Sequence, residues 1–205
     1  MHIHKITENL AIYWSPRCGH GSTYWTLDAW EFMHIGLTLQ QRERDLPAYT
    51  NPKNPKMSRP ALKKIEKESL KSVNELVLVR DPWKRFKSFW RWQRKNSFLD
   101  PSITPFKYID NFNYKLRNQT IPHHSMPQWS QASCLLDGDE EYFDLEDFDS
   151  FVERIAELTG NNYIKPKEVG KDDWGNYKEE IIKPSNFSDL YGKDEEMYYS
   201  LFPKK

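Results

Sequence analysis

Residues 75–90, "ELVLVRDPWKRFKSFW", decide the fold of this chain, because they join an apolar segment directly to the start of a helix. A short apolar run bounded by polar residues is typical of a central parallel strand, so we predict a strand over 75–80. Asp81 and Pro82 follow at once, and they suit the N-cap and the first turn of a helix. Arg80 therefore stands at the carboxyl end of the strand, where open α/β sheets bind ligands.

Strands and helices alternate along the rest of the chain. A second buried strand is expected over 10–14, and a helix that Ser22 or Thr23 caps is expected to run from there to about Met33. Further helices are expected over 61–70, 106–117, 148–158 and 195–202, and a loop rich in Pro, Asn and Lys over 45–60. Strand–helix units in this order predict an α/β sheet with helices on both faces.

The loop after the first strand, within "YWSPRCGHGSTYW" at residues 13–25, is a candidate anion site. Gly19 and Gly21 allow a sharp turn and a close approach to a ligand, and the N–H groups of the following helix favour an anion. Arg17 adds a permanent positive charge. The alternative is an ordinary turn with an exposed arginine, since glycine-rich turns are common.

Arg80 and Ser88 form a second candidate anion site. Ser88 lies about two turns into the predicted helix, from where its hydroxyl can point back toward Arg80. Arginine would supply charge and serine a neutral hydrogen bond. Scattered basic residues on a surface helix would account for Lys84 and Lys87 but not for Arg80, because a charge at the end of a buried strand needs a partner.

Composition limits the partners of the chain. Its 205 residues include 30 Lys and Arg against 30 Asp and Glu, so the basic segment 80–95 indicates a local anion site rather than a nucleic-acid surface. The chain has only the cysteines Cys18 and Cys134, which favours a reducing compartment. It shows neither a signal peptide nor an apolar run of about 18 residues, so we expect a cytoplasmic protein without a membrane partner.

The two candidate anion sites together resemble the sulfotransferases that use 3'-phosphoadenosine 5'-phosphosulfate. In that family a loop of the type P-[KR]-x-G-[ST]-[ST] holds the 5'-phosphosulfate, and V-R-D-P-x-x-R-x-x-S holds the 3'-phosphate. Here "PRCGHGST" and "VRDPWKRFKS" stand in those places, with two extra residues between the basic residue and the Ser-Thr pair. The cofactor-binding set that this resemblance implies is Arg17, Cys18, Gly19, His20, Gly21, Ser22, Thr23, Tyr24, Arg80 and Ser88.

A third stretch, "HHSMPQWSQASC" at residues 123–134, extends the resemblance to the carbohydrate-type enzymes. Their H-x-x-P-Q…C pattern is matched by His124, Pro127, Gln128 and Cys134. The resemblance implies that His124 is the general base. A sugar hydroxyl is a poor nucleophile near neutral pH, and a histidine within hydrogen-bond reach suits its activation. Two other histidines, His123 and His20, stay open as alternatives.

The resemblance implies a single domain over 1–205, a P-loop-type three-layer sandwich with a central parallel sheet flanked by helices. The implied reaction transfers a sulfuryl group from 3'-phosphoadenosine 5'-phosphosulfate to a hydroxyl of a small-molecule or glycan acceptor, leaving adenosine 3',5'-bisphosphate. Arg17 and nearby backbone N–H groups would stabilise the leaving oxygen, so no metal is expected. The alternatives are a P-loop nucleotide kinase or NTPase, which needs a G-K-[ST] tripeptide, and a non-catalytic module that binds anions or nucleic acid.

Overall fold

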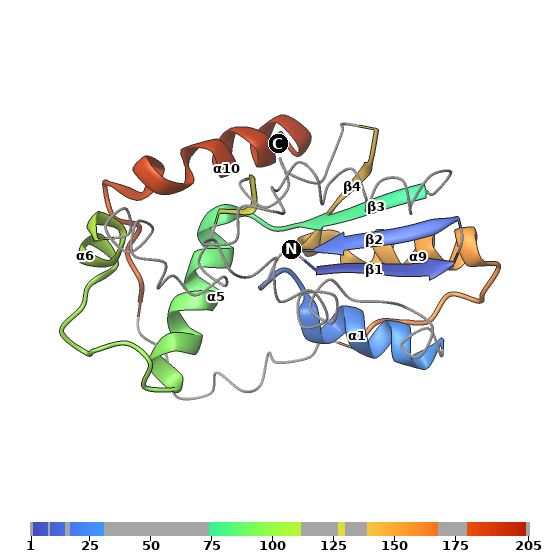
Figure 1. Ribbon diagram of the computed structural model, residues 1–205, viewed down its shortest axis with the longest axis horizontal. Helices are drawn as coiled ribbons and strands as arrows, with labels where there is room; N and C mark the ends of the chain where they lie inside the picture. The colour runs from blue at the N-terminus through green and yellow to red at the C-terminus, as the bar shows by residue number, and fades with distance from the viewer. Residues whose placement is uncertain are drawn as a thin grey trace, which may run out of the picture.

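The computed structural model describes residues 2–7, 9–14, 17–30, 74–111, 127–129, 139–167 and 180–203. Its sheet contains the strands β1 (His2–Thr7), β2 (Leu10–Trp14), β3 (Asn74–Val79) and β4 (Glu141–Asp144), which lie in that order (Figure 1). The strands β2, β3 and β4 are parallel, and β1 pairs antiparallel with β2. The domain is therefore of the α/β class, with a mixed sheet in place of the predicted parallel one.

The two central strands are buried on both faces, as their apolar sequences predict. Every residue of β2 is buried, and so are the last four of β3. One face of the sheet packs against α1 (His20–Ala29) and α9 (Phe148–Thr159), and Leu27, Phe151 and Ile155 join its core. The opposite face packs against Tyr198 of α10 (Phe187–Leu201). Helices therefore cover both faces, as predicted.

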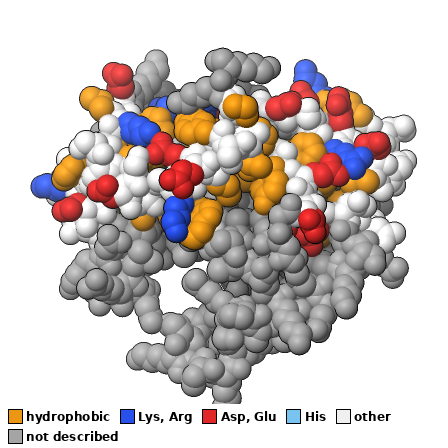
Figure 2. Space-filling view, turned by 90° about the horizontal axis from the view of Figure 1, so that it is seen from above, with side chains coloured by type: hydrophobic (Ala, Val, Ile, Leu, Met, Phe, Trp, Pro, Cys, Tyr) orange, Lys and Arg blue, Asp and Glu red, His pale blue; other side chains and the backbone are white. Residues whose placement is uncertain are grey.

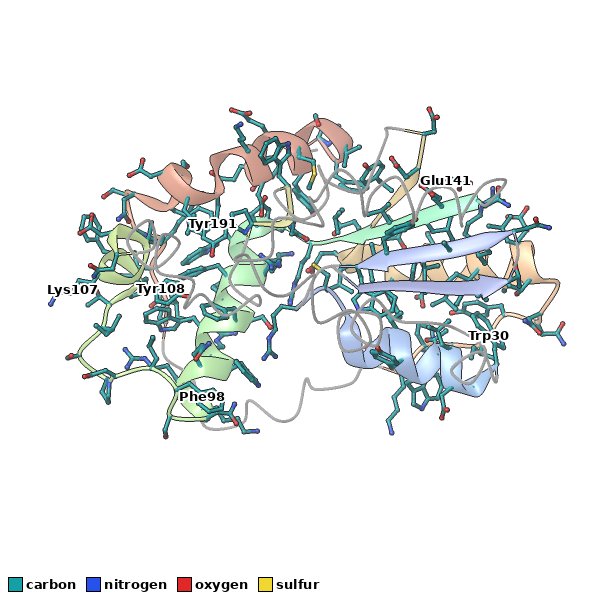
Figure 3. All side chains as sticks on the ribbon, in the orientation of Figure 1. Trp30, Phe98, Lys107, Tyr108, Glu141 and Tyr191 are labelled. Carbon is teal, nitrogen blue, oxygen red and sulfur yellow. The ribbon has the colours of Figure 1, made fainter. Side chains whose placement is uncertain are left out.

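A second core lies beside the sheet and consists mainly of aromatic rings. It forms between α5 (Pro82–Lys95), α6 (Pro105–Asp110) and α10, at the left of Figure 1. Its buried aromatic residues are Phe86, Phe89, Trp90, Tyr108, Phe187 and Tyr191. Figure 3 labels Tyr108 and Tyr191, which belong to this cluster. The rings pack in edge-to-face and stacked contacts. They thus supply most of the buried apolar surface of this core, which contains few aliphatic residues.

The passage from β3 into α5 follows the sequence prediction. A side-chain oxygen of Asp81 accepts a hydrogen bond from the Lys84 backbone N–H at 2.8 Å, and Pro82 occupies the first turn. The first N–H groups of a helix have no partner within it. Asp81 accepts a hydrogen bond from one of them, and Pro82 has no N–H group that would need a partner. Arg80 is consequently fixed between the strand and the helix.

Other element boundaries differ from the predictions. The cap of α1 is Gly19, in a left-handed conformation at φ 67° and without a side-chain cap, so the prediction that Ser22 or Thr23 caps this helix was wrong. This helix ends at Ala29, α6 ends at Asp110, and α10 begins at Phe187, earlier than expected. The strand β1 and the short 3-10 helix η3 (Leu145–Asp147) were not predicted. The predicted loop 45–60 and helix 61–70 lie outside the described residues. None of the described helices is long and apolar enough to cross a membrane.

Replacing Gly19 with alanine is expected to lower the free energy of unfolding by about 1–3 kcal/mol. The residue has φ +67°, and a Cβ there would lie 2.5 Å from Leu145 Cδ1 and 3.3 Å from Leu78 Cδ2. Both the left-handed backbone and the crowding oppose the substitution. Urea denaturation followed by circular dichroism measures the change.

Gly160→Ala is the matched control for this substitution. Gly160 has φ +70°, but a Cβ there would meet nothing within 4 Å. The Gly160→Ala variant should therefore lose only the free energy that a left-handed backbone costs a residue with a Cβ atom. An equal loss of stability in the two variants would mean that the space around Gly19 is not tight.

Candidate functional site

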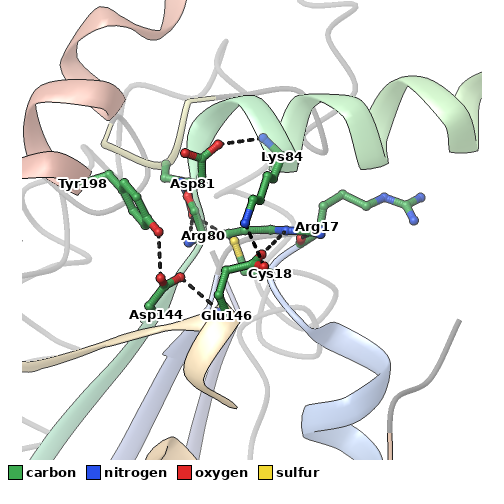
Figure 4. A network of polar contacts seen from close by, with 9 residues as sticks. Arg17, Cys18, Arg80, Asp81, Lys84, Asp144, Glu146 and Tyr198 are labelled. Carbon is green, nitrogen blue, oxygen red and sulfur yellow. Dashed lines mark hydrogen bonds and ion pairs between the residues drawn. The ribbon is translucent and has the colours of Figure 1, made fainter. Parts of the chain in front are cut away.

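The candidate site lies where the carboxyl ends of β2 and β3 meet. The turn after β2 passes through Arg17 and Gly19, both with positive φ, at 71° and 67°. Arg80 follows β3, and its Nη1 donates a hydrogen bond to the Arg17 carbonyl at 3.2 Å (Figure 4). Positive φ is uncommon for a residue other than glycine, and strained backbone often accompanies functional sites. The first two sequence motifs are thus in direct contact.

Gln128 joins the third motif to the same place. Its side chain is fully buried, and its Oε1 accepts from Cys18 Sγ at 2.8 Å and from the Arg80 backbone N–H at 3.1 Å. Its Nε2 donates to the Arg80 carbonyl at 2.7 Å. One amide side chain therefore holds both the turn after β2 and the end of β3.

Gln128 is held in turn by Asp194 of α10. The Asp194 carboxylate accepts from the Gln128 N–H at 2.7 Å and from the Trp129 N–H at 2.6 Å. Asp194 is fully buried, and this burial raises the pKa of its carboxyl. The charge of Arg85, a buried residue of α5, opposes that shift. The C-terminal helix is thereby connected to the candidate site through backbone hydrogen bonds.

Among the described residues, the ion pairs near the turn all use one carboxylate. Glu146 of η3 is the carboxylate that pairs with Lys84, at 2.9 Å, and with Arg80, at 3.8 Å. The side chains of Lys84 and Glu146 are 48% and 41% exposed, so these ion pairs contribute little to stability. Arg17 makes no ion pair with any described carboxylate, and its guanidinium lies 4.2 Å from the centre of the Trp92 ring. Arg80 and Lys84 thus share one carboxylate, and Arg17 has no carboxylate partner among the described residues.

Burial makes the excess charge on Arg17 costly. Desolvation, and then the charge of Arg85, lower the pKa of Arg17 to about 10. The Nε atoms of Arg17 and Arg80 are both buried and make no hydrogen bond to any described group. A bound anion would accept hydrogen bonds from these buried donors and would neutralise the positive charge of the two guanidinium groups.

The start of α1 adds to the same electrostatic preference. Its first turn contains no acidic residue, and no side chain caps it. The N-terminal end of a helix carries a partial positive charge and N–H groups that bind anions. Thr23 lies in this first turn with its buried hydroxyl unpaired among the described residues. The turn, the helix start and Arg80 therefore all favour a negatively charged ligand.

The other predicted site residues differ in how the structure places them. Ser88 is half-buried on α5 and makes no hydrogen bond to Arg80, so their shared role stays a prediction. Tyr24 packs edge-on against Trp14, with ring centres 5.7 Å apart, and burial raises the pKa of its hydroxyl. Gly21 and Ser22 lie in the first turn of α1, which begins at His20, whose side chain is not described. The predicted base His124, its alternative His123, and Cys134 lie outside the described residues.

Sequence reasoning missed Arg85 and Asp194. Each is a charged residue on an otherwise apolar helix face, which is the signal that could have found it. Arg85 precedes the buried Phe86 and Phe89, and Asp194 lies between Tyr191 and Tyr198 at helical spacing. Neither position indicates the other, because their charges act on each other between two helices, α5 and α10, that are distant in the chain.

Comparison of the chain with protein-family models, with curated proteins and with solved structures found no match. The common feature of the site residues is a turn with basic side chains at the carboxyl edge of the sheet, to which Gln128 is hydrogen-bonded.

Proposed function

We propose that the protein is a sulfotransferase. It would transfer a sulfuryl group from 3'-phosphoadenosine 5'-phosphosulfate to a hydroxyl of a small-molecule or glycan acceptor. The observation that supports this proposal is the meeting of three separate stretches, through Arg17, Arg80 and Gln128, at one edge of the sheet. These stretches are the same ones that resemble the family in sequence. We also propose that the sheet forms the middle layer of a P-loop-type sandwich.

The nucleotide has two anionic ends, and the site offers two cationic places. The 5'-phosphosulfate would lie at the turn 17–19 and the start of α1, and the 3'-phosphate would lie at Arg80 with Ser88. Arg80 has donors for both a phosphate and the Arg17 carbonyl, because a guanidinium carries five N–H groups. The hydrogen bonds of Gln128 fix the Arg80 backbone, so the guanidinium starts from a defined position.

The proposed reaction is an in-line displacement at sulfur. A bond forms between the acceptor oxygen and sulfur while the bond from sulfur to the phosphate oxygen breaks. Negative charge builds on the leaving oxygen, where Arg17 and the N–H groups of the first turn of α1 would stabilise it. His124 would take the proton of the acceptor hydroxyl, with His123 and His20 as the alternatives.

The two alternative functions fit the site less well. A nucleotide kinase would have lysine directly before the Ser-Thr pair, where this chain has Gly21. A module that binds nucleic acid would present its cations to a long polyanion, whereas the Nε atoms of Arg17 and Arg80 are buried. Buried donors favour a small anion that enters the turn.

Isothermal titration calorimetry with adenosine 3',5'-bisphosphate, adenosine 5'-monophosphate and ATP with Mg²⁺ tests the proposal. We expect the bisphosphate to bind at least about tenfold more tightly than the monophosphate, because a charge-assisted contact contributes about 1.5–3 kcal/mol. ATP bound as tightly as the bisphosphate would instead favour a kinase or NTPase. Equal, steeply salt-dependent binding of all three would favour a non-catalytic anion-binding module.

A further inference from the structure

A separate cavity lies where the end of α10 crosses the carboxyl ends of β3 and β4. Its volume is about 530 Å³, which falls in the range of about 300–1,000 Å³ that small-molecule sites occupy. Its lining residues are Asp81, Asp144, Tyr198, Tyr199, Leu201, Phe202 and Pro203. Figure 2 shows the molecule from above, with hydrophobic side chains among both acidic and basic ones on this face. None of these residues belongs to the proposed nucleotide site.

Among the described residues, both carboxylates of the cavity accept hydrogen bonds from neutral groups only. Asp81 accepts from the Lys84 backbone N–H at 2.8 Å and from the Tyr199 hydroxyl at 3.1 Å. Asp144 accepts from the Glu146 backbone N–H at 3.1 Å and from the Tyr198 hydroxyl at 2.7 Å (Figure 4). These bonds fix the carboxylates in place without neutralising their charge.

Across the described chain, neither carboxylate forms an ion pair. Lys84 and Arg80, the cations nearest to Asp81 along the chain, pair with Glu146 instead. Two negative charges that line one cavity without a cation repel each other, and a positive ligand would remove this repulsion. The charge of the cavity is therefore opposite to that of the turn at Arg17.

Aromatic rings supply the rest of the wall. Tyr198 lies 5.4 Å from Tyr199 and 5.3 Å from Phe202, measured between ring centres. Leu201 and Pro203 add apolar surface. Carboxylates combined with aromatic faces bind organic ammonium groups, because both attract the positive charge and the rings also contact the attached carbon atoms.

We propose that this cavity is a second binding site, which takes a small organic cation with an ammonium group and an apolar or aromatic body. The ammonium group would donate hydrogen bonds to Asp81 and Asp144, and the body would lie against Tyr198 and Phe202. A neutral polyol could also donate to the carboxylates, but it would leave both charges uncompensated. The proposal does not depend on sulfuryl transfer, because the nucleotide would bind to a different set of residues.

Calorimetry of the full chain with 2-phenylethylamine, and with the neutral 2-phenylethanol, tests this site without any nucleotide. At neutral pH we expect the amine to bind at least about tenfold more tightly than the alcohol. Asp144→Asn should weaken amine binding by about tenfold or more, since it removes one charge and keeps the shape. The matched control is Asp189→Asn, which changes an exposed carboxylate in the first turn of α10 and should leave binding unchanged.

A second variant keeps the test decisive if Asp144→Asn does not fold. Phe202→Leu retains an apolar side chain but removes a ring, and it should weaken amine binding while leaving the carboxylates in place. The proposal is overturned if the alcohol binds as well as the amine, if the amine does not bind at millimolar concentration, or if the folded variants bind it normally. Normal binding of adenosine 3',5'-bisphosphate alongside a failure of amine binding would refute this site alone.

Discussion

Arg80→Gln is expected to weaken the binding of adenosine 3',5'-bisphosphate by at least about 100-fold. The substitution removes a forked cationic donor at the carboxyl end of β3, where Nη1 already contacts the Arg17 carbonyl and the buried Nε has no described hydrogen-bond acceptor. A guanidinium that binds a phosphate makes up to two charge-assisted hydrogen bonds, each contributing about 1.5–3 kcal/mol. Calorimetric titration of both proteins with the bisphosphate measures the difference.

The matched control is Arg154→Gln on α9. Arg154 is 29% exposed and Arg80 is 23% exposed, so the two substitutions remove the same charge at similar burial. Arg154 pairs with Glu141 and Glu157, away from the turn, and its loss should leave nucleotide binding unchanged. The unfolding free energy of Arg80→Gln should fall by about 1–3 kcal/mol, because the part-buried hydrogen bond to the Arg17 carbonyl is lost, whereas the ion pair with Glu146 is long and partly exposed.

The nucleotide series shows what kind of anion Arg80 recognises. If Arg80 holds the 3'-phosphate, Arg80→Gln should weaken the binding of the bisphosphate far more than that of adenosine 5'-monophosphate. An equal loss for both ligands would mean that Arg80 acts as a general positive charge, and the 3'-phosphate assignment would then be wrong. Unchanged binding of the bisphosphate would remove Arg80 from the site altogether.

The parts of the fold that sequence predicted are those that local signals determine. The strand β3 and the helix α5 could be located because an apolar run leads directly into an Asp-Pro helix start. The buried strand β2 and the helix α9 were predicted for similar reasons, and their positions are confirmed. These elements depend on residues that are neighbours in the chain.

The edge strand β1 escaped prediction because its pattern is irregular. Its pairing with β2 shifts register between Lys5 and Thr7, and Ile6 is buried within this irregularity. An extra residue in one strand interrupts the alternation of side chains between the two faces. The sequence "HIHKIT" therefore lacks the strict period of two that identifies a half-buried strand.

The residue types of the candidate site could be predicted from the sequence, but the contacts between those residues could not. Arg17 and Arg80 could be chosen because each follows a predicted strand, and the ends of neighbouring parallel strands meet at one edge of a sheet. The helix start was misplaced because the left-handed Gly19, rather than a hydroxyl side chain, precedes α1. The buried bridge through Gln128 and Asp194 depends on tertiary contacts between distant segments, which no local pattern contains.

Asp194→Ala is expected to lower the free energy of unfolding by about 3–5 kcal/mol. The carboxylate is fully buried and accepts hydrogen bonds from two backbone N–H groups, at Gln128 and Trp129. Alanine would leave both donors without this acceptor, and it would remove a negative charge that acts on the buried Arg85. Urea denaturation measures the loss, and a change below about 1 kcal/mol would show that this contact does not hold the structure together.

Asp189→Ala is the control, because it removes an exposed carboxylate from the same helix and should change stability by no more than about 0.5 kcal/mol. Asp194→Asn separates stability from function, since it keeps one oxygen acceptor and the shape of the side chain. In this folded variant Gln128 would be held less firmly, and through it the Arg80 backbone. Weaker bisphosphate binding with Arg80 intact would then show that α10 positions the anion site, whereas normal binding would limit Asp194 to a structural role.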